Sequence, residues 1–240
     1  FQANRLSAGF EWWPLLERKL VITNVRLFSF QFNLSKRTPQ DPLNLQFLID
    51  AFSKKDTTRK NPNIDLQINS ILLRKGAFRF DIGNAPETPG RFNPKHLSIQ
   101  DLSATISLGA LRKDSIDASI KKMSFTEQSG LQLERLSLQV VGNPDSVCLH
   151  QVEVKLPATT VRIPEAQVAP IAFDNLKSVR DSSQLLLEIA PSRICLKDVA
   201  PLVPAFRNFS DTLDLSADAS GRVNDIALHH LTLKYSDKMP

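Results

Sequence analysis

The sequence predicts an all-β protein built mainly from long, antiparallel, bulged strands that form one curled, groove-forming sheet. Apolar residues alternate at period two over many stretches, which is typical of strands with one buried face. Prolines and polar turn residues separate these stretches. A helical period of 3.6 is absent from most of the chain, and only two segments favour short helices.

The alternation recurs in one form. Two alternating apolar positions come first, then an interruption of two residues, and then two or three more alternating apolar positions. Its copies are Leu20, Ile22, Val25, Leu27; Leu97, Ile99, Leu102, Ala104, Ile106; Leu131, Leu133, Leu136, Leu138, Val140; Val147, Leu149, Val152, Val154, Leu156; and Ile226, Leu228, Leu231, Leu233, Tyr235. One extra residue would turn every later side chain to the other face, whereas a β-bulge absorbs that residue and bends the strand. Bulges are therefore predicted at Thr23-Asn24, Gln100-Asp101, Glu134-Arg135, His150-Gln151 and His229-His230.

Turn residues divide the chain into strands joined in sequence. Residues 97–157 predict a four-strand antiparallel meander, and Ser220-Gly221 predicts another hairpin turn. A first short helix is expected after Asp41-Pro42, through residues 45–52. A second is expected from Asp198, as its N-cap, through Phe209.

We expect these 240 residues to be part of a longer polypeptide, with residues 1–60 forming the first strands and helix of a groove and residues 61–240 its β-meander. No run of 18 apolar residues and no signal peptide occurs, so any anchor or export signal is expected outside the segment.

The net charge of +5 is dispersed, and the one basic cluster, residues 54–60, contains Asp56. Nucleic-acid binding usually needs a denser basic face with stacking aromatics, so a nucleic-acid partner is not expected. Cys148 and Cys195 have apolar neighbours and are expected to be buried thiols, with a single long-range disulfide as the alternative.

The sequence carries none of the constellations that catalysis needs. It contains no nucleophile elbow, no phosphate-binding glycine loop and no dinucleotide fingerprint, and we expect neither an enzyme nor a cofactor. Adjacent His229 and His230 would point to opposite faces of a strand, which disfavours a metal site. Asp211, Asp214 and Asp218 lack the spacing of a calcium loop and are interpreted as a hairpin edge.

Many one-sided strands with few covering helices leave an apolar face that something must cover. A second sheet, a sheet curled on itself, or a bound apolar ligand would each do so. The candidate residues of an apolar groove, and thus of contact with acyl chains, are Leu97, Ile99, Leu102, Ile106, Leu131, Leu133, Leu136, Leu138, Val152, Val154, Leu231 and Leu233. The alternative is a closed β-sandwich that binds protein partners by strand addition at an exposed edge.

Several stretches resemble one family. They are residues 71–76 (ILLRKG), 88–97 (TPGRFNPKHL), 111–138, 195–204 (CLKDVAPLVP) and 18–53, which contains LNLQFLIDAF. These stretches are similar to the TamB-like translocation and assembly module proteins. They are spread over residues 18–204, so the resemblance extends along most of the chain, although they are strand-and-turn patterns rather than chemical signatures.

The resemblance implies an AsmA-like, repeating β-groove in the periplasm of a Gram-negative bacterium, anchored to the inner membrane by a segment outside these residues. It also implies a role in outer-membrane biogenesis, namely phospholipid transport toward the outer membrane or protein assembly within it. Outer-membrane assembly proteins are then further expected partners. The family offers no catalytic residues to carry over.

Overall fold

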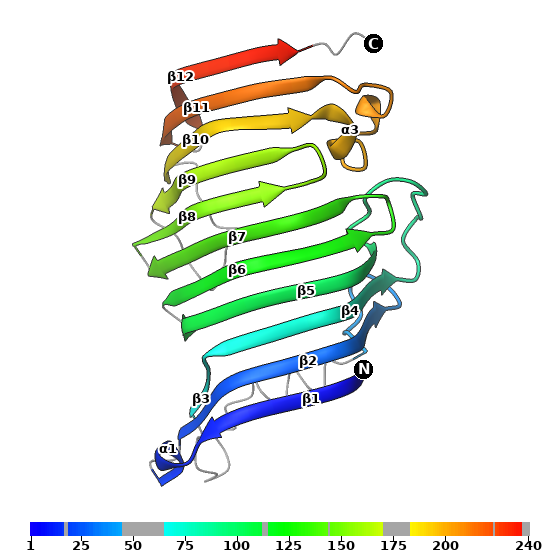
Figure 1. Ribbon diagram of the computed structural model, residues 1–240, viewed down its shortest axis with the longest axis vertical. Helices are drawn as coiled ribbons and strands as arrows, with labels where there is room; N and C mark the ends of the chain where they lie inside the picture. Colours follow the sequence, from blue (N-terminus) through cyan, green and yellow to red (C-terminus); the bar gives the residue numbers. More distant parts are fainter. Residues whose placement is uncertain are drawn as a thin grey trace. The chain divides into compact units, whose positions relative to one another are not determined.

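The computed structural model confirms an all-β protein (Figure 1). It describes residues 1–16, 19–44, 65–111, 115–143, 145–169, 183–222 and 224–236. Within these ranges the helices are short: α1 (Trp13–Leu16), α3 (Leu196–Val199) and the 3₁₀ turn η2 (Pro204–Phe206). No helix of the described ranges is long and apolar enough to cross a membrane.

The chain divides into two compact units. Unit 1 contains residues 1–103 and 125–130, and unit 2 contains residues 104–124 and 131–240. Strands β5 (His96–Leu111) and β6 (Ile116–Glu127) each contribute residues to both units. The predicted boundary near residue 60 falls outside the described residues and stays a prediction.

Unit 1 is built on β1 (Gln2–Glu11), β2 (Lys19–Lys36), β3 (Asp65–Ile68), β4 (Ser70–Ile82) and the first half of β5. β1 pairs antiparallel with β2, as expected for this fold class. β2, however, pairs in parallel with both β3 and β4. A parallel neighbour needs a long crossover, which strand periodicity cannot reveal, and residues 37–64 supply it here.

Aromatic rings contact one another across the strands of unit 1. Phe32 stacks on Phe78 with ring centroids 6.2 Å apart, and Phe1 meets Phe32 edge-on at 5.9 Å. Phe30 is buried above Gly76, where an added Cβ would lie 2.0 Å from the ring. Gly76 is therefore required by the close approach of this ring.

Unit 2 is an antiparallel meander in chain order. After β6 come β7 (Gln132–Asn143), β8 (Ser146–Lys155), β9 (Thr160–Ala169), β10 (Gln184–Cys195), β11 (Thr212–Arg222) and β12 (Asp225–Ser236), each paired with the next. The predicted meander over residues 97–157 is thus confirmed. The last hairpin turns after Arg222, which is paired with Asp225, and not at Ser220-Gly221, which lie within β11.

Three of the five predicted bulges appear in the strand registers, and the registers do not test those at Gln100-Asp101 and Glu134-Arg135. Thr23 is an extra residue of β2 opposite β1, and His229 is an extra residue of β12 opposite β11. In β8, two residues between His150 and Glu153 face one residue of β7. The β7–β8 pairing begins at Arg135, so it does not test the predicted bulge at Glu134-Arg135.

One non-glycine residue with a left-handed backbone lies in each of four strands. Ser29, Lys75, Asp101 and Gln151 have φ between 47° and 53°, a region that disfavours residues with a side chain. Asp101 and Gln151 are the second residues of predicted interruptions, whereas Ser29 and Lys75 lie outside the predicted ones. Backbone conformation as well as register therefore marks two of the predicted interruptions.

The two predicted helices fare differently. Residues 45–52 of the first lie outside the described residues. The second prediction, one helix over residues 198–209, is wrong, because the segment forms only α3 and η2. Pro201 and Pro204 cannot donate the backbone hydrogen bonds of a continuous helix. Asp198 lies inside α3, and its carboxylate accepts a hydrogen bond from the Ala158 N–H at 2.7 Å, which ties α3 to the β8–β9 turn.

Candidate functional site

The apolar residues of unit 2 form straight rows across its strands. Residues directly opposite each other in a ladder share a face of the sheet, so the printed registers define these rows. One row runs through Val140, Leu149, Ala166, Leu187, Ala219 and Leu228, and the next through Gly142, Val147, Val168, Leu185, Gly221 and Ile226. Both rows cross all six strands from β7 to β12 without a polar side chain. We call this side of the sheet the apolar face.

The neighbouring residues of the same strands form rows of opposite character. One of them runs through Gln139, His150, Glu165, Glu188, Asp218 and His230. Every member is polar or titratable. Because alternate residues of a strand point to opposite sides, this row belongs to the other side of the sheet, the polar face. The sheet of unit 2 is therefore amphipathic across its whole width.

The bulges keep the apolar face continuous along each strand. Beyond the bulge of β12, Leu231 lies opposite Ala217 and Leu233 opposite Leu215. Beyond that of β8, Val154 lies opposite both Leu136 and Val161. Without the extra residue these side chains would turn to the polar face.

Burial along the apolar face falls from the inner strands to the edge. Val152 and Ala219 are 8% exposed, and most apolar-face residues of β7 to β10 are half-buried. On β12 the exposed fractions reach 49% for Ile226, 55% for Leu228 and 59% for Leu233. The described residues of unit 2 include no second sheet, so neighbouring strands within the sheet provide much of the burial that the described residues show.

The predicted groove residues fall in both units. Leu97, Ile99 and Leu102 are half-buried in unit 1, whereas Ile106 lies in the part of β5 that belongs to unit 2. The rest lie in unit 2, where Leu133 and Val152 are buried, Leu231 and Leu233 are exposed, and four more are half-buried: Leu131, Leu136, Leu138 and Val154. The registers bring Leu136, Val154, Leu231 and Leu233 onto the apolar face.

Sequence reasoning missed the contributions of β9, β10 and β11. Val161, Ala166, Val168, Leu185 and Leu187 join the apolar rows. Prolines disturb the alternation in two of these strands, Pro164 in β9 and Pro191 in β10. In β11 two of the apolar positions are alanines, Ala217 and Ala219, which carry a weak hydrophobic signal. The signal that could have found β9 is the same interrupted form, in which Val161 and Ile163 precede Pro164-Glu165 and Ala166 and Val168 follow it.

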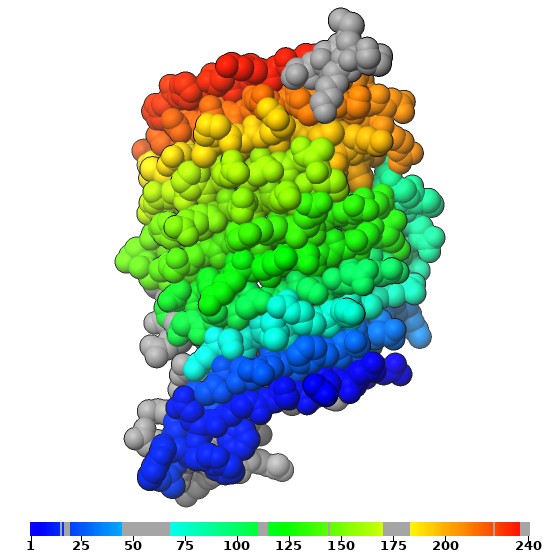
Figure 2. All heavy atoms as spheres, viewed as in Figure 1, coloured from blue at the N-terminus to red at the C-terminus, as the bar shows by residue number. Residues whose placement is uncertain are grey.

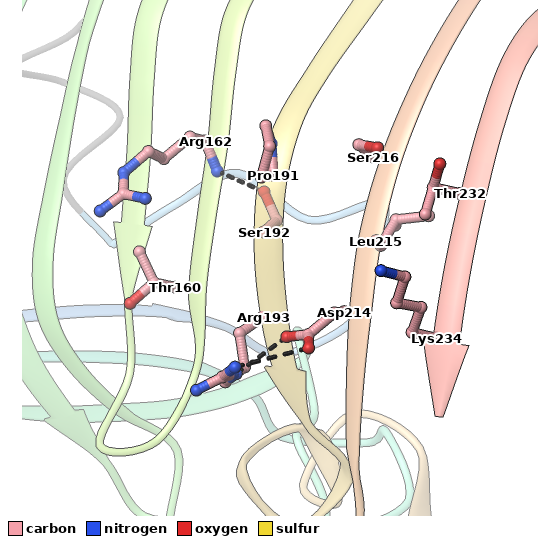
Figure 3. Close-up of a pocket in the computed structure, with 10 residues that line it drawn as sticks. All are labelled: Thr160, Arg162, Pro191, Ser192, Arg193, Asp214, Leu215, Ser216, Thr232 and Lys234. Carbon is pink, nitrogen blue, oxygen red and sulfur yellow. Dashed lines mark hydrogen bonds and ion pairs between the residues drawn. The ribbon is translucent and has the colours of Figure 1, made fainter. Parts of the chain in front are cut away.

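The polar face carries a hollow of about 580 Å³ over β9 to β12 (Figure 3). It lies at the β10 bulge, where Ala190 and Pro191 together face Ser216. The Ser192 hydroxyl accepts a hydrogen bond from the Arg162 N–H at 2.9 Å and donates one to the Ala190 carbonyl at 2.7 Å. Polar and charged side chains dominate its lining, so this hollow does not suit an acyl chain.

Ion pairs cross the strands of the polar face. Arg193 Nε donates to Asp214 at 2.8 Å, and the hydrogen bond raises the pKa of Arg193 and lowers the pKa of Asp214. Glu153 lies between Arg135 at 3.4 Å and Arg162 at 3.8 Å. These pairs are well exposed and screened by water, so they contribute mainly to the order of neighbouring strands.

A histidine fastens the loop of residues 83–94 in unit 1. His96 Nδ1 lies 2.7 Å from Asp81 Oδ1, and Nε2 lies 3.0 Å from the Ala85 carbonyl oxygen. Both nitrogens face acceptors, an arrangement that only the doubly protonated ring satisfies fully. The hydrogen bond to Asp81, followed by that to Ala85, raises the pKa of His96.

The two cysteines are free thiols, so the disulfide alternative does not hold; Cys148 is half-buried and Cys195 buried. Among the described residues no group of three or more metal-ligating side chains is suitably placed. The comparisons with known proteins add no name: no family model, no curated protein and no solved structure matches this chain.

Proposed function

We propose that the apolar face of β7 to β12 is a surface that accommodates phospholipid acyl chains. The main support for this proposal is the pair of rows across six strands in which every residue is apolar or glycine. An exposed apolar patch of this extent marks a ligand or interaction surface. Acyl chains fit it because they are long, flexible and require no hydrogen-bond donors or acceptors.

The wider setting follows from the sequence resemblance. In this proposal the chain is a non-enzymatic segment of an envelope-biogenesis protein that lies in the periplasm. A part of the polypeptide outside these residues would hold it at the inner membrane. Lipid would move along the apolar face toward the outer membrane, or the face would support protein assembly there.

The test combines lipid analysis with one substitution on each face. Leu136→Asp places a carboxylate on the apolar face, and Ser137→Asp places the same group on the neighbouring, oppositely directed position. The purified protein should contain phospholipid by mass spectrometry and take up a fluorescent fatty acid. Leu136→Asp should abolish uptake while keeping the β-sheet circular dichroism spectrum, and Ser137→Asp should change neither.

Two outcomes would overturn the proposal. Reproducible absence of phospholipid together with no fatty-acid uptake would remove the lipid role. Global unfolding of Leu136→Asp would instead support the closed β-sandwich, because a closed core cannot solvate an unpaired charge.

A further inference from the structure

The hollow on the polar face of β9 to β12 has the size of a small-molecule site. Its volume of about 580 Å³ lies within the range of ligand pockets in proteins. We call it the basic hollow, because three of its four charged lining residues are cations: Arg162, Arg193 and Lys234, against Asp214. The four strands form consecutive bands in the space-filling view, from yellow-green for β9 to red for β12 (Figure 2). The hollow therefore extends across adjacent strands of one unit.

Two cations lie on either side of the one carboxylate that lines the basic hollow. Arg193 Nε donates to Asp214 Oδ1 at 2.8 Å, and Nη2 of the same guanidinium donates to Oδ2 at 3.4 Å. Lys234 is directly opposite Asp214 in the β11–β12 ladder, and no dashed line joins it to the other residues drawn in Figure 3. Arg193 already balances the single charge of Asp214, so the ammonium of Lys234 adds a net positive charge.

A second carboxylate is shared by two cations on the β8–β9 side of the hollow. Glu153 lies 3.4 Å from Arg135 and 3.8 Å from Arg162, and its one charge cannot balance both guanidinium groups. The two sets together hold four cations and two carboxylates, an excess of two positive charges. The side chains of Arg162 and Arg193 are 58% and 63% exposed, so a ligand in water can reach both.

Hydroxyl groups lie among these charges. Thr160 is directly opposite Arg193 in the β9–β10 ladder, and Ser216 is opposite Thr232 in the β11–β12 ladder. All three hydroxyl residues line the hollow. Hydroxyl, guanidinium and ammonium groups all donate hydrogen bonds. Phosphate oxygens are strong acceptors of such bonds, and the guanidinium fork matches the geometry of a phosphate.

A neighbouring row of the polar face carries the opposite charge. On the other side of the β10 bulge, Glu165, Glu188 and Asp218 lie directly opposite one another in β9, β10 and β11. Three carboxylates in one row repel an anion. An anionic group on the polar face is therefore directed to the basic hollow.

From this arrangement we infer that the basic hollow binds a phosphate group, carried either by a small water-soluble molecule or by a lipid headgroup. Lys234 and Arg193 contact its oxygens from β12 and β10, and Arg162 contributes positive charge from β9. The inference goes beyond the proposed function and does not rest on it, because the basic hollow and the apolar rows lie on opposite faces of the sheet.

A phosphorus NMR titration of glycerol phosphate with the full 240-residue chain tests the site. Lys234→Gln removes the excess charge beside Asp214 and should raise the dissociation constant about five- to tenfold. Asp214→Asn removes the competing carboxylate and should lower the dissociation constant about two- to fivefold. A purely structural role of these residues would not move the two variants in opposite directions. Circular dichroism spectra that match the wild type would show that both variants fold.

Lys122→Gln is the matched control. Lys122 is an exposed residue of β6 outside the hollow, and its substitution changes the net charge by the same amount as Lys234→Gln. The dissociation constant of this control for glycerol phosphate should equal that of the wild type.

Vesicle cosedimentation separates the two sources of the phosphate group. Phosphatidylcholine vesicles with and without phosphatidic acid differ in an accessible phosphate monoester. Vesicle binding that requires phosphatidic acid and is weakened by Lys234→Gln assigns the site to a lipid headgroup, whereas dependence on Lys234 in the titration alone assigns it to a soluble molecule. Dependence in both assays means that both sources use the site. Binding that is absent from both assays, or that Lys234→Gln weakens no more than Lys122→Gln does, would overturn the inference.

Discussion

β8 and β12 follow the same sequence form and differ in what surrounds them. Each has apolar pairs on both sides of a two-residue polar interruption, His150-Gln151 in one and His229-His230 in the other. Strands flank β8 on both sides, and its Val152 is 8% exposed; among the described residues one strand flanks β12, and Leu231 is 53% exposed. The form thus determines which face a side chain takes, whereas the neighbouring strands determine how far it is buried.

The largest effect should come from placing the same charge in the two strands. Val152→Asp buries a carboxylate without a partner and should lower the free energy of unfolding by about 3–5 kcal/mol. Leu231→Asp leaves the carboxylate in water and should lower it by less than about 1 kcal/mol. Urea denaturation of both variants measures the difference. Equal losses would mean that burial on this face does not follow the position of the strand in the sheet.

Glycine substitutions should separate the two bulges by their backbone conformation. Gln151 has φ of 52°, whereas His229 does not have a positive φ. Gln151→Gly should raise the free energy of unfolding by about 0.5–1 kcal/mol, because glycine adopts the left-handed region without strain. His229→Gly should lower it by about 0.5–1 kcal/mol through the greater freedom of the unfolded chain. Thermal unfolding would detect both changes. A lower free energy of unfolding for Gln151→Gly would show that contacts of the Gln151 side chain stabilise the fold by more than the left-handed backbone costs.

The smallest effect is expected at His96 of unit 1, whose contacts with Asp81 and the Ala85 carbonyl are polar rather than apolar. The raised pKa of His96 means that its contribution to stability is fully present below its ordinary value of 6.5 and is lost as the pH rises through the raised value. The free energy of unfolding of the wild type should therefore exceed that of His96→Gln by more at acidic than at alkaline pH. Urea denaturation across this range measures it. An advantage that grows with pH would contradict the doubly protonated ring.

The sequence was informative where one strand form repeats. It predicted the meander of residues 97–157 and the bulges at Thr23, Gln151 and His229, because apolar alternation and its interruptions are local signals. It did not reveal the parallel pairing of β2 with β4, since pairing across residues 37–64 depends on tertiary contacts. The helix expected over residues 198–209 failed because apolar spacing outweighed two prolines in the prediction.

The candidate site was predictable to the same extent. Leu136, Val154, Leu231 and Leu233 were expected to line one apolar face, and the registers place them there. The contributions of β9 to β11 were not expected, because Pro164 and Pro191 interrupt the pattern and Ala217 and Ala219 are too small to signal a core. The number of strands that each apolar row crosses depends on how the strands pair, and the sequence of a single strand does not determine this pairing.

Site-specific photo-crosslinking tests the central claim most directly. A photoreactive side chain at position 154 would project from the apolar face of β8, and one at position 153 from its polar face. In protein prepared with phospholipid vesicles, the probe at Val154 should form covalent adducts with acyl chains and the probe at Glu153 should not. Adducts at both positions in equal yield, or at neither, would contradict an apolar face that binds lipid.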